Sequence, residues 1–197
     1  GIPATYGGIE RHVEEIARRL VAMGHQVDVF CRLHYTAPGT TCHNIHLLRR
    51  PSLNTKHFDT VTHVVWATVE SMMRRYDIVQ FHALGPSVLA GLPRLTGART
   101  VVTVHGLDWQ REKWGRTASW FLKQCEGPAA HFPDRTIVVS KTLRDYFNTH
   151  HHCDAAFIPN GTNLLPARPA RKILQFGLTP GKYVLFVGRL VPEKGVH

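Results

Sequence analysis

Two runs of β-branched and apolar residues are followed by polar side chains suited to chemistry. His105 and Asp108 come directly after residues 100–104, and His82 ends the run 77–82. In α/β proteins, ligands bind in the crevice at the carboxyl ends of parallel strands, so these side chains are candidates for a small-molecule site. A turn in which Asp108 caps a helix explains the first cluster equally well. A hydrogen-bonded histidine near the sheet edge is the somewhat better explanation of His82.

A pair of glycines, Gly7 and Gly8, stands directly before an amphipathic run over residues 9–20. Glycine lets the backbone approach a ligand closely, and a helix N-terminus attracts negative charge, so this position suits a phosphate. A flexible turn is the commoner reason for such a pair, and the pair alone is weak support for phosphate binding.

Two cations, Arg189 and Lys194, share one loop after the apolar run 182–188. Arginine offers a rigid fork of donors and lysine a mobile point charge, and together they suit a diphosphate. The alternative is a solvated basic loop.

Metal and thiol chemistry find little support in the sequence. The tract 150–153 reads His-His-His-Cys, but adjacent residues rarely converge on one ion, so a solvated loop is the better interpretation. The four cysteines, at positions 31, 42, 125 and 153, form no Cys-x-x-Cys pair. Scattered thiols without a secretory signal are typical of free or buried cysteines in a reducing, cytoplasmic setting. We therefore predict no metal site in this chain.

The overall charge restricts the class of partner. The net charge is +10 and the isoelectric point is near 9.9, which favours an acidic partner such as a nucleotide, a nucleic acid or an anionic membrane. The basic residues are scattered in pairs, without the long runs or RNA-type aromatic motifs that nucleic-acid binding favours. The composition, 43% hydrophobic and 19% charged, is typical of a globular protein, and no apolar run is long enough to cross a bilayer.

Helical and strand patterns alternate along the chain. Apolar spacing predicts helices over 9–20, 57–75, 85–95, 117–130 and 141–149, and strands over 27–31, 45–48, 77–82, 100–105, 135–140 and 155–158. This alternation predicts an α/β fold with a doubly wound, mostly parallel, Rossmann-like sheet. Such a domain normally opens with a strand that leads into its glycine-rich loop, and we expect that first strand to be missing here.

The composition changes after residue 161. A proline-bearing stretch with a short helix over 171–176 is followed by an apolar run that predicts a new strand over 182–188. We therefore divide the chain into a domain over 1–165, a linker over 166–181 and the start of a truncated second Rossmann-like domain over 182–197.

Taken together, these segments resemble the retaining GT-B glycosyltransferases of family 4 along the whole chain. Gly-Gly-Ile-Glu at 7–10, Val-His-Gly-Leu-Asp at 104–108, Ile-Pro-Asn-Gly at 158–161 and the segment 186–195 follow in the family's order. The last is the most specific, and it resembles the entry to the family's nucleotide-binding C-terminal domain. The opening residues and the segment 107–115 resemble the branch that builds bacterial surface polysaccharides, including rhamnosyltransferase-like members.

The resemblance implies roles for the side chains at the sheet edge. His105 would lie beside the transferred sugar, with Asp108 next to it, and both are expected to be catalytic. His82 is a weaker candidate for the acceptor side. Ser140 and Asn160 would shape the cleft.

The resemblance also implies how the donor is held. Gly7 and Gly8 would approach the donor diphosphate or the acceptor near the cleft. Arg189 and Lys194 would neutralise the diphosphate as it leaves, where stabilisation is most useful. Because the protein supplies these cations, no metal or other cofactor is expected.

The implied reaction is transfer of a hexosyl group from a nucleotide sugar to an acceptor with retention at the anomeric carbon. No second carboxylate nucleophile is identified, so the acceptor would attack on the face from which the diphosphate departs. The basic balance and the tryptophans at 109, 114 and 120 motivate a lipid-linked glycan acceptor and peripheral binding to the anionic inner face of the cell membrane.

The family's paired glutamates, seven residues apart in the second domain, would hold the donor and are missing from this chain. We therefore expect the fragment to lack turnover by itself. Two alternatives remain open: a GT-B-fold sugar-nucleotide epimerase or phosphorylase, and a non-catalytic binding fragment.

Overall fold

The computed structural model describes residues 1–5, 7–55, 58–112, 114–164, 166, 169 and 171–188. Its strands form two parallel sheets. One sheet runs in the order β3 (Ile78–His82), β4 (Arg99–Val104), β5 (Arg135–Val138) and β6 (Ala156–Phe157), and the other pairs β1 (Asp28–Arg32) with β2 (His46–Arg50). Every ladder between named strands is parallel, which confirms the predicted Rossmann-like α/β class.

The main core forms around the four-stranded sheet. Strand β4 lies between β3 and β5 and is largely β-branched, as a strand covered on both faces requires. Val102 and Val104 on β4, Val138 on β5 and Phe147 are all fully buried in one cluster. This core holds the carboxyl ends of β3 and β4 in fixed positions.

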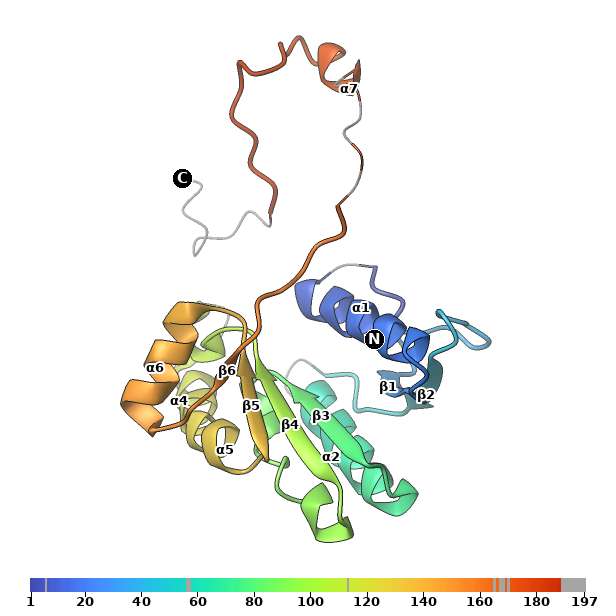
Figure 1. The fold of residues 1–197 in the computed structure, drawn as a ribbon, viewed down its shortest axis with the longest axis vertical. Coiled ribbons are helices and arrows are strands. Elements are labelled where there is room, and N and C mark those ends of the chain that lie inside the picture. The colour runs from blue at the N-terminus through green and yellow to red at the C-terminus, as the bar shows by residue number, and fades with distance from the viewer. Residues whose placement is uncertain are drawn as a thin grey trace.

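The helices surround this sheet unevenly. Figure 1 shows α1 (Gly8–Ala22) at the end of the molecule where β1 and β2 lie. It shows α4 (Arg116–Gln124), α5 (Glu126–His131) and α6 (Lys141–His151) together at the opposite side. α6 packs on β5 and β6, and α2 (Phe58–Arg74) packs against β2 and α3 (Leu84–Ser87). No described helix is long and apolar enough to cross a membrane.

Two predicted helices are each divided into shorter elements. The helix predicted over 85–95 is only α3, followed by turns and the 3-10 helix η1 (Pro93–Thr96). The helix predicted over 117–130 divides into α4 and α5 at Cys125. Pro128 has no N–H to donate to the Gln124 carbonyl, so α4 ends there. Pro93 stands at the first position of η1, where its missing N–H is tolerated.

The sheet is divided between β1 and β3. In a doubly wound sheet, the first strand lies between the second and the fourth. No strand of the described residues lies between β1 and β3, and the two sheets share no ladder. Tyr76, just before β3, bridges the division through a hydrogen bond to Asp28 and an edge-on contact with Phe30.

A smaller cluster packs beneath α1. Ile2, Ala17, Cys31, Cys42 and Ile45 are its buried members. All four cysteines are free; Cys31, Cys42 and Cys125 are buried and Cys153 is partly buried, which confirms the predicted free or buried thiols.

The strand predicted over 182–188 is not formed. These residues are in turns or irregular structure, and all of them are exposed; Val184 is 99% exposed. The short helix predicted before them is present as α7 (Arg171–Leu174). A strand is stabilised by its neighbours in a sheet, and no described segment pairs with these residues. Figure 1 shows this part of the chain extending away from the sheets.

Candidate functional site

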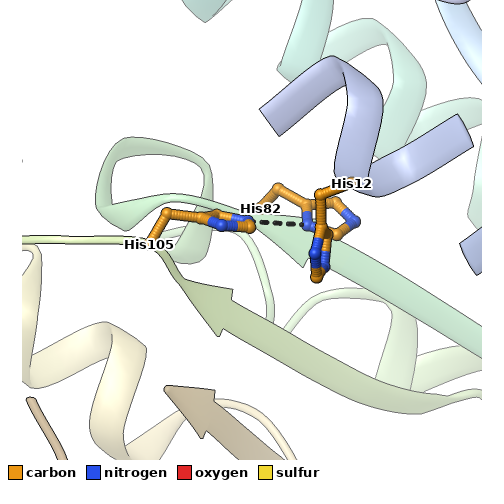
Figure 2. Close-up of side chains that lie close together, drawn as sticks. All are labelled: His12, His82 and His105. Carbon is orange, nitrogen blue, oxygen red and sulfur yellow. Dashed lines mark hydrogen bonds between the residues drawn. The ribbon is translucent and has the colours of Figure 1, made fainter. Parts of the chain in front are cut away.

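Three histidines from three elements meet at the carboxyl edge of the four-stranded sheet. His82 is the last residue of β3 and pairs in register with Thr103, so it lies at the same edge as His105, which follows β4. His82 Nδ1 is 3.2 Å from His105 Nε2, and the two rings stack with centroids 5.5 Å apart. His12 on α1 meets both rings edge-on, 4.7 Å from His105 and 5.6 Å from His82 (Figure 2).

His12 is the residue that sequence reasoning missed. It lies one turn into α1, between the apolar Ile9 and Ile16 at helical spacing, and it is partly buried. A histidine on the inward face of a helix that follows a glycine pair was the available signal. Its proximity to His82 and His105 depends on the packing of α1 beside the sheet, which no local pattern encodes.

The three imidazoles are neutral at neutral pH. Burial lowers the pKa of His82 to about 3, and the charges of His105 and His12 add to this effect. Burial, then His12 and then Arg111, lower the pKa of His105 to about 4. Burial also lowers the pKa of His12, against an opposing hydrogen bond with Asn160. Neutral imidazole offers one donor and one acceptor nitrogen, which suits binding of sugar hydroxyls.

The backbone beside His82 is in a conformation that alanine rarely adopts. Ala83 has φ 73° and ψ 168°, a region occupied almost only by glycine. The Ala83 N–H donates to the Thr103 carbonyl at 2.9 Å, which holds this turn against β4. The strained turn therefore fixes the course of the chain directly after His82.

Asp108 begins the 3-10 helix η2 (Asp108–Gln110) instead of capping it, because Leu107 occupies the N-cap position. Its Oδ1 is 3.4 Å from Arg111 Nε. The predicted alternative, a helix-capping aspartate, is therefore wrong. Asp108 is three residues from His105, and its carboxylate is held by the arginine.

The glycine pair lies at the start of α1, as predicted. Gly7 is the N-cap with φ 104°, a conformation that favours glycine, and a Cβ there would collide with the Glu10 carboxylate. At Gly8 a Cβ would meet open space. The first backbone N–H groups of a helix can bind an anion, but a phosphate at Gly7 would have to displace Glu10.

Other predicted residues are placed as follows. Arg189 and Lys194 lie outside the described residues. Ser140 is the N-cap of α6 and accepts a hydrogen bond from the Leu143 N–H at 3.1 Å. Asn160 hydrogen-bonds with His12, so it lies beside one of the three histidines.

The tract 150–153 is not the solvated loop that was predicted. His150 and His151 form the last turn of α6, and Cys153 packs against the main core. His151 Nε2 is 3.0 Å from the buried carboxylate of Glu126, which attracts it inward. Among the described residues, the tract contributes to neither cluster with metal-ligand spacing.

The three tryptophans that motivated membrane binding differ in exposure. Trp109 packs against the main core and donates to Glu126 Oε1 at 2.6 Å, and Trp114 is partly buried. Only Trp120 is freely exposed, at 66%. An exposed aromatic of α2, Trp66, was not among the predicted residues.

Comparison with known proteins decides the family. A family model described as Glycosyltransferase Family 4 matches residues 6–164, from the residue before the glycine pair to the end of the sheet domain. The chain belongs to glycosyltransferase family 4. This family 4 chain is also similar to a D-inositol 3-phosphate glycosyltransferase of Arthrobacter sp. (strain FB24), with 25% identity over 96% of the chain and 51% of that protein. The chain therefore spans about half the length of the curated relative that it matches.

Proposed function

We propose that this family 4 domain is the acceptor-side half of an enzyme that transfers a hexosyl group from a nucleotide sugar. The observation that carries the proposal is the pair of neutral imidazoles, His82 and His105, 3.2 Å apart at the carboxyl edge of the sheet. Such an edge is where α/β proteins bind their ligands, and uncharged imidazoles hydrogen-bond hydroxyl groups without attracting the charged diphosphate away from its own site.

Each residue then takes one role. His105 hydrogen-bonds the transferred sugar, and Asp108 orients the loop that carries it through its ion pair with Arg111. His82 lies deeper in the sheet edge and faces the acceptor. Retention at the anomeric carbon follows if the acceptor attacks on the face from which the diphosphate departs.

The donor diphosphate is assigned to two places. The N-terminus of α1 at Gly7 and Gly8 offers backbone N–H groups once the Glu10 carboxylate is displaced, and Arg189 and Lys194 neutralise the charge that develops on the leaving group. These protein cations make a metal unnecessary for transfer. Residues 1–165 form the acceptor-side domain, 166–181 the linker and 182–197 the start of the nucleotide-sugar domain, whose further strands would pair with 182–188.

The proposed acceptor is a lipid-linked glycan of a bacterial surface polysaccharide at the cytoplasmic face of a membrane. Support comes from α2, on which six large apolar side chains are exposed: Phe58, Val61, Val65, Trp66, Val69 and Met73. Arg49, Arg50 and Arg74 border a hollow beside Trp66 and Met73, and Glu70 in the same hollow pairs with Arg50 and Arg74. Apolar side chains rimmed by arginines suit a surface of anionic headgroups.

Liposome sedimentation tests the membrane part. We expect the chain to sediment with phosphatidylglycerol vesicles at low salt and less at high salt, and Trp66→Ser to weaken this binding several-fold. Trp120→Ser, which changes an exposed tryptophan on α4, is the matched control and should bind normally. Equal loss in both variants, or no binding at low salt, would contradict the assignment of α2 as the membrane face.

Transfer assays test the function. We expect the 197-residue chain to bind nucleotide sugars weakly by calorimetry and to transfer no sugar until a complete second domain is joined to it. Tight binding or turnover by this chain alone would contradict the proposal that the donor is held mainly by the second domain. Release of an epimerised nucleotide sugar without any acceptor would favour an epimerase, and phosphate-dependent cleavage a phosphorylase.

A further inference from the structure

The three histidines are spaced like the ligands of a metal ion. One ring nitrogen each from His12, His82 and His105 lies within 4.8 Å of the other two. Figure 2 shows the three rings converging from α1, β3 and the segment after β4. All three residues are partly buried.

The distance between the His82 and His105 nitrogens matches tetrahedral coordination, and His12 lies within 4.8 Å of both. Zinc–imidazole bonds of about 2.0–2.1 Å at tetrahedral angles place two ligand nitrogens about 3.3–3.4 Å apart. The distance between His82 Nδ1 and His105 Nε2 is 3.2 Å. His12 Nε2 is buried and has no hydrogen-bond partner among the described residues, so it is free to become the third ligand.

We propose that His12, His82 and His105 form a binding site for a divalent transition-metal ion of the zinc class, with a water molecule as the fourth ligand. On binding, the hydrogen bond between His82 and His105 gives way to two metal bonds. The proton that lay between the rings moves to the outer nitrogen of its ring by exchange with solvent. The ion therefore binds three neutral imidazoles without a net change in their protons.

The surroundings are compatible with a cation. The imidazoles are neutral, which is the form that metals bind, so no proton has to be removed to free a ligand. Arg111 is the positive group whose charge reaches His105, and its guanidinium is paired with Asp108.

A second cluster, Glu14, Cys42 and His43, is less suited to a metal. The Glu14 carboxylate already accepts the Ala4 N–H at 2.8 Å and approaches Arg11 at 3.6 Å. Burial raises the pKa of the Cys42 thiol, so the thiolate that a metal needs is disfavoured. Among the described residues the three histidines, in contrast, hydrogen-bond only with neutral groups, His82 with His105 and His12 with Asn160.

The site goes beyond the proposed function and does not depend on it. His82 and His105 are the imidazoles assigned above to the acceptor and the sugar, so a bound ion and the substrates would compete for them. The metal would act as an inhibitor of transfer, which agrees with a transfer reaction that needs no metal.

Calorimetric titration of the chelator-treated chain with zinc chloride tests the proposal. We expect one tight ion per chain, and His12→Ala and His105→Ala should each weaken it by more than the about 10- to 100-fold that loss of an outer-shell partner costs. His25→Ala, which removes an exposed histidine outside the cluster, should bind like the wild type. Circular dichroism of each variant confirms that its fold is retained.

Zinc K-edge absorption of the wild-type chain loaded with one equivalent gives an answer that needs no variant. Three imidazoles and one oxygen ligand are expected. Coordination by one imidazole or by oxygens alone would overturn the proposal, as would weak binding of several ions that all variants share. Either result would leave the transfer proposal unaffected, because no nucleotide sugar takes part.

Discussion

The four-stranded sheet and residues 182–188 contain apolar runs of similar character, yet only the sheet region forms strands. In β4, Val102 and Val104 are fully buried between β3 and β5. In the later run, Val184 and Val187 are 99% and 85% exposed. β-Branched residues therefore favour a strand only where a pleated, half-buried surface is available, and neighbouring strands must supply that surface.

Truncating one phenylalanine in each region tests this difference in packing most directly. Phe147→Ala empties a fully buried position of the main core and should lower the free energy of unfolding by about 3–5 kcal/mol. Phe186→Ala, in the exposed run, should change it by less than about 0.5 kcal/mol. Urea denaturation measures both, and a similar loss in the two variants would show that residues 182–188 pack on the sheet domain.

The next largest effect on stability is expected at Glu126, the buried carboxylate beside the sheet. Glu126 accepts hydrogen bonds from Trp109 at 2.6 Å and Tyr146 at 3.1 Å, and it contacts His151 at 3.0 Å. Glu126→Ala leaves these polar atoms without their partner and should cost about 2–4 kcal/mol in urea denaturation. Glu112→Ala, at an exposed position, should be neutral, and equal effects would mean that the network adds no stability.

The pH dependence of stability tests the sheet edge. The pKa of His82 in the folded chain is about 3, against 6.5 for the free side chain, so the unfolded chain binds a proton more readily. Above pH 6.5 His82 is neutral in both states, so the folded chain has its full stability. As pH falls toward 3, proton binding to the unfolded chain lowers the free energy of unfolding. His82→Asn should flatten the slope of unfolding free energy between pH 4 and 6.5, and His25→Asn should leave it unchanged. An unaltered slope in His82→Asn would show that His82 is not buried as described.

The smallest expected effect comes from the strained turn after β3. Ala83→Gly relieves the positive φ of 73° and should raise the free energy of unfolding by about 1 kcal/mol, since the relief exceeds the entropic cost of glycine. Ala90→Gly, at a buried position without positive φ, should instead destabilise the chain. Destabilisation by both changes would remove the argument for strain beside His82.

Much of the sheet domain follows from the sequence because its signals are local. The β-branched residues of β4 and the helical spacing in α1 are each sufficient to identify an element. Apolar periodicity alone extended the helix over 117–130, and Pro128 divides it. The strand predicted over 182–188 failed because pairing is a property of neighbours and not of the run itself.

In the candidate site, too, the residues with local signals were predicted and those placed by tertiary packing were missed. His82 and His105 were predicted from their positions at strand ends, and the register of β3 with β4 brings them together. His12 was missed because it reaches His82 and His105 from a helix far earlier in the chain, through tertiary packing alone. The buried pairing of His151 with Glu126 was missed for the same reason.

The central claim is that the imidazoles at the sheet edge serve sugar transfer, and the kinetics of one variant test it most directly. In an enzyme in which this domain is joined to a complete nucleotide-sugar domain, His105→Ala should lower kcat/KM for the donor by about 100-fold or more, as loss of a group that stabilises the transition state does. His25→Ala should leave it unchanged. Equal transfer rates in His105→Ala and the wild type would contradict the account.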